Sequence, residues 1–313
     1  MAGRRAKLDP SWVERPPPRA FGPTPRARDP GGPAAPRICG LPPVFDEIET
    51  FARASAARAL DAAHASGRRP VWAAARWMVP PGWTSARSER VAEVVREVLS
   101  DGGVPLAWQP EWVGPNLRAV FSVAMDGRSE PVRALCPSDR LILSKPLGND
   151  VLFEAYLHGE RTVSQTRAWV RAGITPQPEV AQWLQQTSGT PGVQLGEGGL
   201  AEACWLLAEE GQLDAVLDAS RLPALPGATE FLFSGRVPEG CGANRRRLGR
   251  QLSVARGVPE TAANLSLAPE WAGGILVAVP RDGPVPSWGT TIGELRNPRA
   301  ERPRVRLLGR IGP

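Results

Sequence analysis

The stretch PEWAGGILVAVP, residues 269–280, places a glycine pair directly before an unbroken apolar run. The run from Gly274 to Val279 has the length of a strand, and its lack of polar alternation predicts a buried strand. The stretch RLILSK, residues 140–145, alternates with period two and precedes a Pro-Leu-Gly turn, which predicts a second strand. Together they place a β-sheet in the second half of the chain.

Predicted helices interleave with these strands. The clearest one covers residues 197–210, EGGLAEACWLLAEE. Further helices are predicted at 151–158, 162–171, 178–187 and 224–233, and further strands at 213–219, 290–295 and 304–308. The elements do not follow a strict βαβ repeat, so we expect an α+β fold in two layers.

The first half predicts two helices and three strands. An alanine-rich stretch without proline or glycine predicts a helix over 44–66. A second, amphipathic helix is predicted over 84–101, with Thr84 or Ser85 as its cap and Gly102 at its end. Its inward face carries Val91, Val94, Val95 and Val98. Strands are predicted at 70–78 (buried), 117–125 and 132–135, and a domain boundary at 136–139.

Length and charge restrict the class of protein. A chain of 313 residues suggests two domains. Of the net charge of +6, five units belong to residues 1–37, which hold eight basic residues, three acidic residues and nine prolines. This composition predicts a disordered tail. The remaining body is nearly neutral, so we expect no nucleic-acid partner. No apolar run approaches the ~20 residues of a membrane span, so we expect a cytoplasmic protein without a membrane partner.

The four cysteines are far apart and form no CxxC pair, and the chain has only two histidines. The cysteines are Cys39, Cys136, Cys204 and Cys241. Their spacing favours scattered reduced thiols over a zinc site.

Several strings, in order, resemble selenophosphate synthetases (selenide, water dikinases). PSD with LILSKPLG, within 137–148, is similar to the family's PGD–LILTKPLG segment, and residues 269–280 are similar to PQTSGGLLIAVP. Three further stretches resemble family segments: LDASRLPALPGA (217–228), PEGCGANRR (238–246) and residues 41–70, which match without a gap. The resemblance predicts a turn at 238–246. The resemblance covers roughly residues 39–308.

This resemblance implies the two-domain aminoimidazole ribonucleotide synthetase-like (PurM-like) architecture, shared with thiamine-monophosphate kinase and hydrogenase maturation proteins. It implies a truncated N-terminal α/β domain over 38–136, the family's nucleotide-binding half, and a C-terminal α+β domain over 137–313. The tail occupies 1–37. In the family, nucleotide lies between the N-terminal domains of a dimer.

The family transfers phosphate from ATP to selenide, which requires carboxylate ligands for magnesium. By the resemblance, its three metal aspartates fall on Cys39, Ala62 and Gln194. Asp61 stands one position before Ala62, where a helical side chain points about 100° away. The family's catalytic cysteine or selenocysteine and its lysine have no counterpart. We therefore expect no catalytic residue, no metal ligand and no cofactor, with ATP and magnesium bound only if the site is rebuilt.

Seven residues are candidates for binding a nucleotide or its cation: Asp46, Glu47, Arg58, Asp61, Gly196, Gly198 and Gly199. Asp46 and Glu47 match the family's paired aspartates; such a pair holds a cation or simply complements a helix dipole. Arg58 replaces a family asparagine. The glycine turn at 196–199 opens a helix, which suits a phosphate or tight packing.

Other notable residues have ordinary structural interpretations. Lys145 positions its turn, His64 packs in the core, and Arg245 to Arg247 form a solvated face. Trp271 replaces a small polar family residue and is predicted to fill a vacated nucleotide pocket.

Three functions follow from these observations. The first is a non-catalytic binding or regulatory paralogue in selenium metabolism, paired with itself or with an active homologue. The second is an ATP-dependent phosphotransferase of the selenide, water dikinase type, rebuilt from Asp46, Glu47 and Asp61. The third is a small-molecule sensor that keeps only the interdomain cleft.

Overall fold

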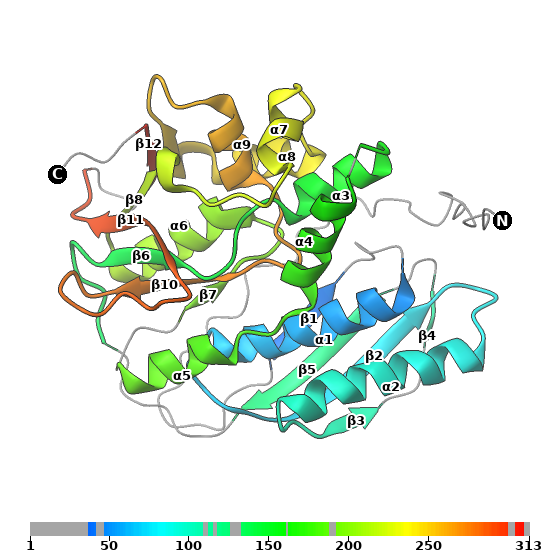
Figure 1. Cartoon of the computed structure of the whole chain (residues 1–313). Coiled ribbons are helices and arrows are strands. Elements are labelled where there is room, and N and C mark those ends of the chain that lie inside the picture. The colour runs from blue at the N-terminus through cyan, green and yellow to red at the C-terminus, as the bar shows by residue number, and fades with distance from the viewer. Residues whose placement is uncertain are drawn as a thin grey trace.

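A computed structural model describes residues 37–41, 47–108, 112–114, 118–125, 133–160, 162–187, 192–299 and 304–309. Within these ranges the chain forms two β-sheets with helices packed on them. Figure 1 shows the N-terminal sheet with its two helices below and the C-terminal sheet with most of the remaining helices above. The predicted tail lies outside the described residues except for Arg37, which begins the first strand. Among the described residues, no helix is both long and apolar enough to cross a bilayer.

The N-terminal sheet has the strand order β1-β5-β2-β3, with β4 also paired to β2. Its strands are β1 (Arg37–Leu41), β2 (Pro70–Val79), β3 (Leu106–Trp108), β4 (Trp112–Val113) and β5 (Arg118–Met125). β5 runs antiparallel to β1 and β2, whereas β3 and β4 run parallel to β2. The predicted strands at 70–78 and 117–125 are therefore confirmed, although Val71 and Trp72 at the start of β2 are exposed.

Two helices belong to this sheet, α1 (Ile48–His64) and α2 (Ser85–Asp101). α2 begins where the sequence predicts it, because the Thr84 hydroxyl accepts the Arg87 N–H at 3.4 Å, and it ends at Gly102. Its four predicted valines are buried. α1 is rich in alanine, which lets it lie close to its neighbours, and the Phe51 ring meets Trp77 of β2 edge-on at 5.4 Å.

The C-terminal sheet has the order β7-β10-β6-β11-β8-β12-β9. Its strands are β6 (Arg140–Leu143), β7 (Val193–Gln194), β8 (Asp214–Asp218), β9 (Leu252–Val254), β10 (Ile275–Val279), β11 (Thr290–Arg296) and β12 (Val305–Leu308). All pairs are antiparallel except those of β12 with β8 and β9. β10 is buried along its whole length, as its unbroken apolar sequence predicts.

The helices of this half are α3 (Asn149–Leu157), α4 (Val163–Ile174), α5 (Pro178–Gln186), α6 (Gly199–Gly211), α7 (Ala228–Phe233), α8 (Glu239–Leu248) and α9 (Glu260–Leu267). The predictions of α3 to α6 are confirmed. The helix predicted from residue 224 begins only at Ala228. The Leu225 N–H still donates to the Leu147 carbonyl, and the Leu225 carbonyl accepts from the Ala228 N–H in a turn.

Two sequence predictions were wrong. Residues 238–246 form most of α8 rather than a turn: their glycines disfavour a helix, but burial of Cys241, Asn244 and Leu248 against the helices around them overrides that preference. Residues 133–135 are not a strand, because the Asp139 carboxylate accepts from Arg133 and from the Cys136 N–H and holds this segment as a loop.

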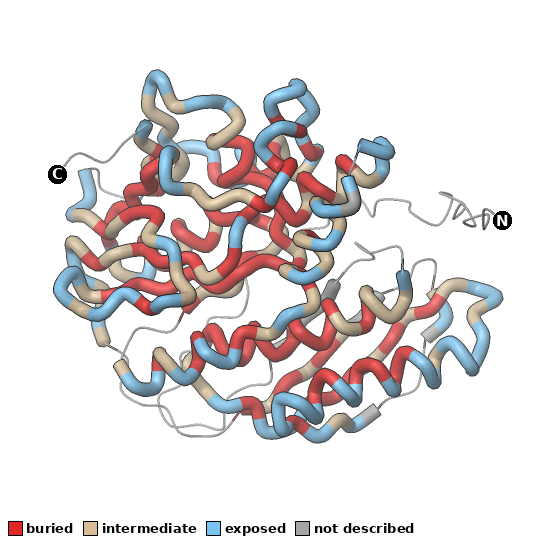
Figure 2. The backbone as a smooth tube through the Cα atoms, in the orientation of Figure 1, coloured by how far each residue is buried: buried red, intermediate tan, exposed pale blue. Residues whose placement is uncertain are grey.

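The predicted α+β fold class is confirmed, and one element serves both halves. α1 contacts α2 and β5 of the N-terminal sheet and also α4, α5 and β7. The largest buried cluster runs without interruption from Phe51 and Trp77 to Leu141 and Leu200. Figure 2 shows this buried stripe following α1 and both sheets. The division into domains near 136–139 stays a prediction, and α1 is the element that positions the candidate site.

Candidate functional site

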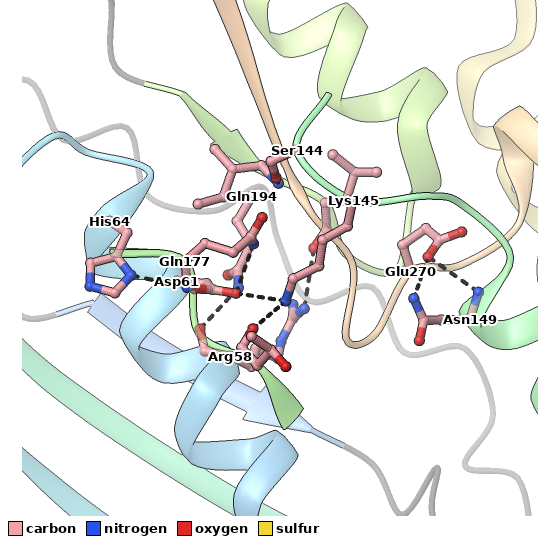
Figure 3. A network of polar contacts seen from close by, with 12 residues as sticks. Arg58, Asp61, His64, Ser144, Lys145, Asn149, Gln177, Gln194 and Glu270 are labelled. Carbon is pink, nitrogen blue, oxygen red and sulfur yellow. Dashed lines mark hydrogen bonds and ion pairs between the residues drawn. The ribbon is translucent and has the colours of Figure 1, made fainter. Parts of the chain in front are cut away.

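Asp61 is the centre of a buried polar network between α1 and the C-terminal half (Figure 3). Its side chain is 2% exposed. The Lys145 ammonium lies 3.2 Å from Oδ2. The Gln177 backbone N–H donates to Oδ1 at 2.7 Å, and the Gln177 side-chain amide donates to Oδ2 at 2.9 Å. Both carboxylate oxygens are therefore occupied by donors from the protein itself.

The donors come from three parts of the C-terminal half. Lys145 follows β6, and its ammonium also donates to the Thr175 carbonyl at the end of α4, at 2.7 Å. Gln177 caps α5, directly before Pro178 in the first turn of that helix. Since the N–H of a cap residue has no partner within its helix, the Gln177 N–H is available to donate to Asp61. One carboxylate on α1 thus ties together β6, α4 and α5.

The electrostatics favour the ionised carboxylate. Burial acts to raise the pKa of Asp61, but the Lys145 ammonium, His64 and Gln177 outweigh it, so the pKa lies below its usual range. His64 Nδ1 lies 3.4 Å from Asp61 Oδ1, and its ring is buried. The predicted packing of His64 in the core is confirmed.

Arg58 stands one helical turn before Asp61 and also reaches into the C-terminal half. Its Nη1 donates to the carbonyls of Trp271 at 2.6 Å and of Leu195 at 3.2 Å. In return, the Gln194 amide donates to the Arg58 carbonyl at 2.9 Å. Arg58 therefore binds the backbone of two C-terminal loops.

Glu270 forms a second buried group beside this network, and sequence reasoning missed it. Glu270 is fully buried, and its carboxylate accepts three hydrogen bonds at the start of α3. The donors are the Gly148 N–H, the Asn149 N–H at 3.3 Å and the Asn149 side-chain amide at 3.0 Å. Burial raises the pKa of Glu270 to about 7, against the opposing effect of these donors. The sequence held one signal for this site, because Glu270 stands where the resembled family has glutamine.

These residues do not fit magnesium. A magnesium ligand must present free oxygen lone pairs, whereas the oxygens of Asp61 already accept from an ammonium and two amide N–H groups. Gln194, at a family metal position, directs its amide nitrogen to the Arg58 carbonyl. Across the part of the chain that the structure describes, no three His, Cys, Asp or Glu side chains gather closely enough to hold a metal ion.

The candidates Glu47 and Asp61 are not brought together. Glu47 is exposed at the cap of α1, where it accepts from the Thr50 hydroxyl. Asp61 is 14 residues further along the same helix, roughly 20 Å away at 1.5 Å per residue. They cannot share one cation. Asp46 lies outside the described residues.

The glycine turn of 196–199 leads into α6 and is tightly packed. Gly199 has φ of +67°, and a Cβ there would lie 2.4 Å from the Ala268 carbonyl. A Cβ on Gly198 would meet the side chains of Glu202 and Arg247, which pair at 3.0 Å. A carboxylate therefore already stands in the first turn of α6, and a phosphate role for Gly196, Gly198 and Gly199 stays a prediction.

The remaining singled-out residues are spread over the fold. Trp271 is half-buried against the main core, and its proposed filling of a nucleotide pocket stays a prediction. The exposed Arg245 pairs with Glu260 at 2.7 Å, in keeping with a solvated face. Cys204 and Cys241 are buried free thiols whose pKa values burial raises, and Cys136 is exposed. The side chain of Cys39 lies outside the described residues.

Comparison with known proteins adds to this geometry. No family model matches the chain. It is 27% identical over 252 residues to a selenide, water dikinase from Nitratidesulfovibrio vulgaris, covering 77% of this chain and 70% of that protein. It is 29% identical over 245 residues to a selenide, water dikinase from Burkholderia cenocepacia, covering 75% and 68%.

Solved structures show the fold. The thiamine monophosphate kinase from Aquifex aeolicus has a TM-score of 0.65 at 15% identity, with 90% of this chain and 92% of that chain covered. The hydrogenase maturation protein HypE has a TM-score of 0.58 at 16% identity, covering 86% and 82%. The predicted PurM-like architecture is confirmed. The chain is thus similar in sequence to selenide, water dikinases and similar in fold to thiamine monophosphate kinase and HypE.

Proposed function

We propose that this chain is a non-catalytic, cytoplasmic member of its family that acts by binding, as a regulatory paralogue in selenium metabolism. One observation carries the proposal: the buried carboxylate nearest a family metal position, Asp61, is neutralised by Lys145 at 3.2 Å. The ammonium supplies the positive charge that a magnesium ion would otherwise bring to this carboxylate.

The energetics support a permanent ion pair. Magnesium gives up its water reluctantly and requires near-octahedral oxygen ligands. To bind Asp61 it would have to displace Lys145 and the two Gln177 donors, leaving buried donors without acceptors. The family positions at Ala62 and Gln194 offer no second carboxylate. The network therefore favours a closed junction between the halves over a phosphoryl-transfer site.

A thermal unfolding experiment tests the loss of nucleotide chemistry. A ligand at 100 times its dissociation constant stabilises the native state by ~2.7 kcal/mol, an easily measured shift. We expect millimolar ATP with magnesium to raise the midpoint temperature of unfolding no more than ATP with EDTA does. A magnesium-dependent shift, followed by selenide-dependent ATP turnover, would overturn the proposal.

Binding by a paralogue needs a partner surface, and the outer face of the N-terminal sheet supplies one. Trp72 of β2 is 43% exposed and lies on the face opposite to Ala73, Ala75 and Trp77, which are buried beneath the helices. We propose that this face pairs with a second copy or with an active homologue. Light scattering should show a dimer that Trp72→Glu converts to a monomer. A wild-type monomer that also fails to co-purify with an active homologue contradicts this partner.

The alternative is an ATP-dependent phosphotransferase with a rebuilt site. It is favoured by the similarity to proteins named selenide, water dikinase, and by likeness in fold to a HypE solved in complex with ATP. Under this alternative Asp61→Asn abolishes magnesium-dependent ATP turnover while the folded state survives. Wild-type protein without turnover eliminates it.

A further inference from the structure

Three arginines meet at one end of the C-terminal sheet, far in sequence from the network of Asp61. Arg296 is the last residue of β11, and its backbone lies opposite Asp214 in the register with β8. The backbone of Arg306 in β12 lies opposite Val216 of the same strand. β8 lies between β11 and β12, with Arg299 in their connection. The topology thus gathers the three residues beside β8. Figure 1 shows β8, β11 and β12 in the same part of the molecule.

The alternation of the strands directs these side chains away from the main core. Val305 and Leu307, on either side of Arg306, belong to the core, and so does Leu295 before Arg296. Arg296 and Arg306 therefore share the opposite face. They are half-buried and Arg299 is exposed, so the cluster opens to solvent.

Among the residues that the structure describes, two acidic side chains near this cluster, Asp214 and Glu294, already have partners. The Asp214 carboxylate is fully buried and accepts the backbone N–H groups of Arg299 at 3.2 Å and Arg304 at 3.0 Å. The Glu294 carboxylate pairs with Arg296. Arg306 Nη1, by contrast, is buried and has no hydrogen-bond partner. A buried donor of this kind is costly unless an acceptor is supplied.

The electrostatics show the same excess of positive charge. Burial first, and then the charges of Arg299 and Arg296, lower the pKa of Arg306, and Asp214 opposes them only in part. An anion that accepts hydrogen bonds from several guanidinium groups at once reduces the electrostatic repulsion between them.

We propose that Arg296, Arg299 and Arg306 form a binding site for a compact phosphate-bearing anion. A planar guanidinium matches phosphate oxygens with paired N–H groups, and the unpartnered Nη1 of Arg306 supplies a donor for such an oxygen. The site is independent of ATP chemistry at the junction between the halves, since its residues come only from β11, β12 and their connection.

The test is titration calorimetry at low salt with inorganic phosphate, pyrophosphate and AMP, each against chloride of equal ionic strength. We expect saturable binding by the wild type that is weakened at least roughly tenfold in Arg306→Leu and in Arg299→Ala, since a charge-assisted hydrogen bond contributes about 1.5–3 kcal/mol. Tighter binding of AMP than of phosphate would identify a nucleotide as the source of the group.

Arg221→Ala is the matched control. Arg221 is an exposed arginine beyond the opposite end of β8, where it pairs with Asp218 at 3.5 Å, and its loss should leave the affinity unchanged. Arg299 is exposed, so its variant stays informative if Arg306→Leu fails to fold. The proposal is overturned if the wild type shows no saturable binding, or if Arg299→Ala binds as tightly as Arg221→Ala.

Discussion

Single residues carry the clearest consequences, because two buried carboxylates are held in opposite ways. Asp61 faces an ammonium and keeps its charge, and its pKa lies below the usual range. Glu270 faces only neutral N–H donors, and burial raises its pKa to about 7. An acid with an ammonium partner is stabilised as the anion, whereas an acid with dipoles alone does not recover the hydration that it loses.

Removal of Lys145 should therefore be costly. In Lys145→Met, Asp61 keeps its Gln177 donors but loses its counter-charge, and we expect a loss of ~3–5 kcal/mol in the free energy of unfolding, measured with urea at neutral pH. The exposed pair of Arg236 and Glu160 provides the control, since Arg236→Met should cost no more than ~1 kcal/mol. Equal effects of the two variants would show that Lys145 does not hold Asp61.

Glu270 should make stability fall as the pH rises. Its carboxyl has a pKa of about 7 in the folded protein against 4.5 when unfolded, so the folded state binds the proton more tightly. The stabilisation is complete below pH 4.5 and is lost as the pH rises through 7, a change of ~3 kcal/mol.

The substitution Glu270→Gln should remove that slope. The glutamine oxygen still accepts from Gly148. Its NH₂ group replaces the oxygen that accepts from Asn149, and it can donate to Asn149 Oδ1, which is buried without a hydrogen-bond partner, once the Asn149 side-chain amide turns over. Urea unfolding between pH 5 and pH 8, in roughly unit steps, measures the difference from wild type. Glu160→Gln, at an exposed carboxylate, is the control. A slope that persists in Glu270→Gln assigns the pH dependence to another group.

Among the elements, the start of α6 shows why a glycine motif predicts poorly. Gly196 accepts from the Gly199 and Glu270 N–H groups, and Gly199 adopts a positive φ against the Ala268 carbonyl. A glycine turn before a helix is needed equally for close backbone approach and for phosphate binding, so its sequence alone does not separate the two.

The substitution Gly199→Ala separates two costs to stability: the steric clash of an added Cβ and the strain of a positive φ in a residue other than glycine. We expect a cost of at least ~2 kcal/mol, because the new Cβ would lie 2.4 Å from the Ala268 carbonyl and the turn must shift. Gly103 has nearly the same φ, +69°, with nothing within 4 Å of an added Cβ, so Gly103→Ala should cost only the backbone strain of ~1–2 kcal/mol. Thermal midpoints of the two variants measure the difference, and equal midpoints would mean that the turn relaxes freely.

For the whole molecule, α1 joins both halves. One face of the helix packs on the N-terminal sheet, and the other sends Arg58 and Asp61 into the C-terminal half. Because the buried cluster is continuous across this junction, the two halves should unfold together.

Calorimetry of the wild type should accordingly show a single transition. Arg58→Ala leaves the Leu195 and Trp271 carbonyls without this donor and should lower the midpoint or split the transition. Arg53, on the same helix, bonds Glu97 of α2 within the N-terminal half, so Arg53→Ala should keep one transition near the wild-type midpoint. Two transitions in the wild type would show that the halves fold separately.

The sequence by itself determined the elements whose residue pattern is local. The valine stripe and threonine cap of α2, and the apolar run of β10, lie where their patterns predict them. The interleaved helices and strands predicted the α+β fold class, and the order of the family-like strings predicted the PurM-like architecture. α8, which contains Gly240 and Gly242, was missed because its helix depends on neighbours distant in the chain.

Only the tertiary structure decided what the candidate site residues do. Asp61 lies 84 residues from Lys145 and 116 from Gln177, and the three arginines beside β8 meet only because β12 inserts next to that strand. Periodicity reports whether a side chain is buried, because burial follows from local geometry. It does not report which partner a buried charge finds, because that partner is set by the packing of segments far apart in the chain.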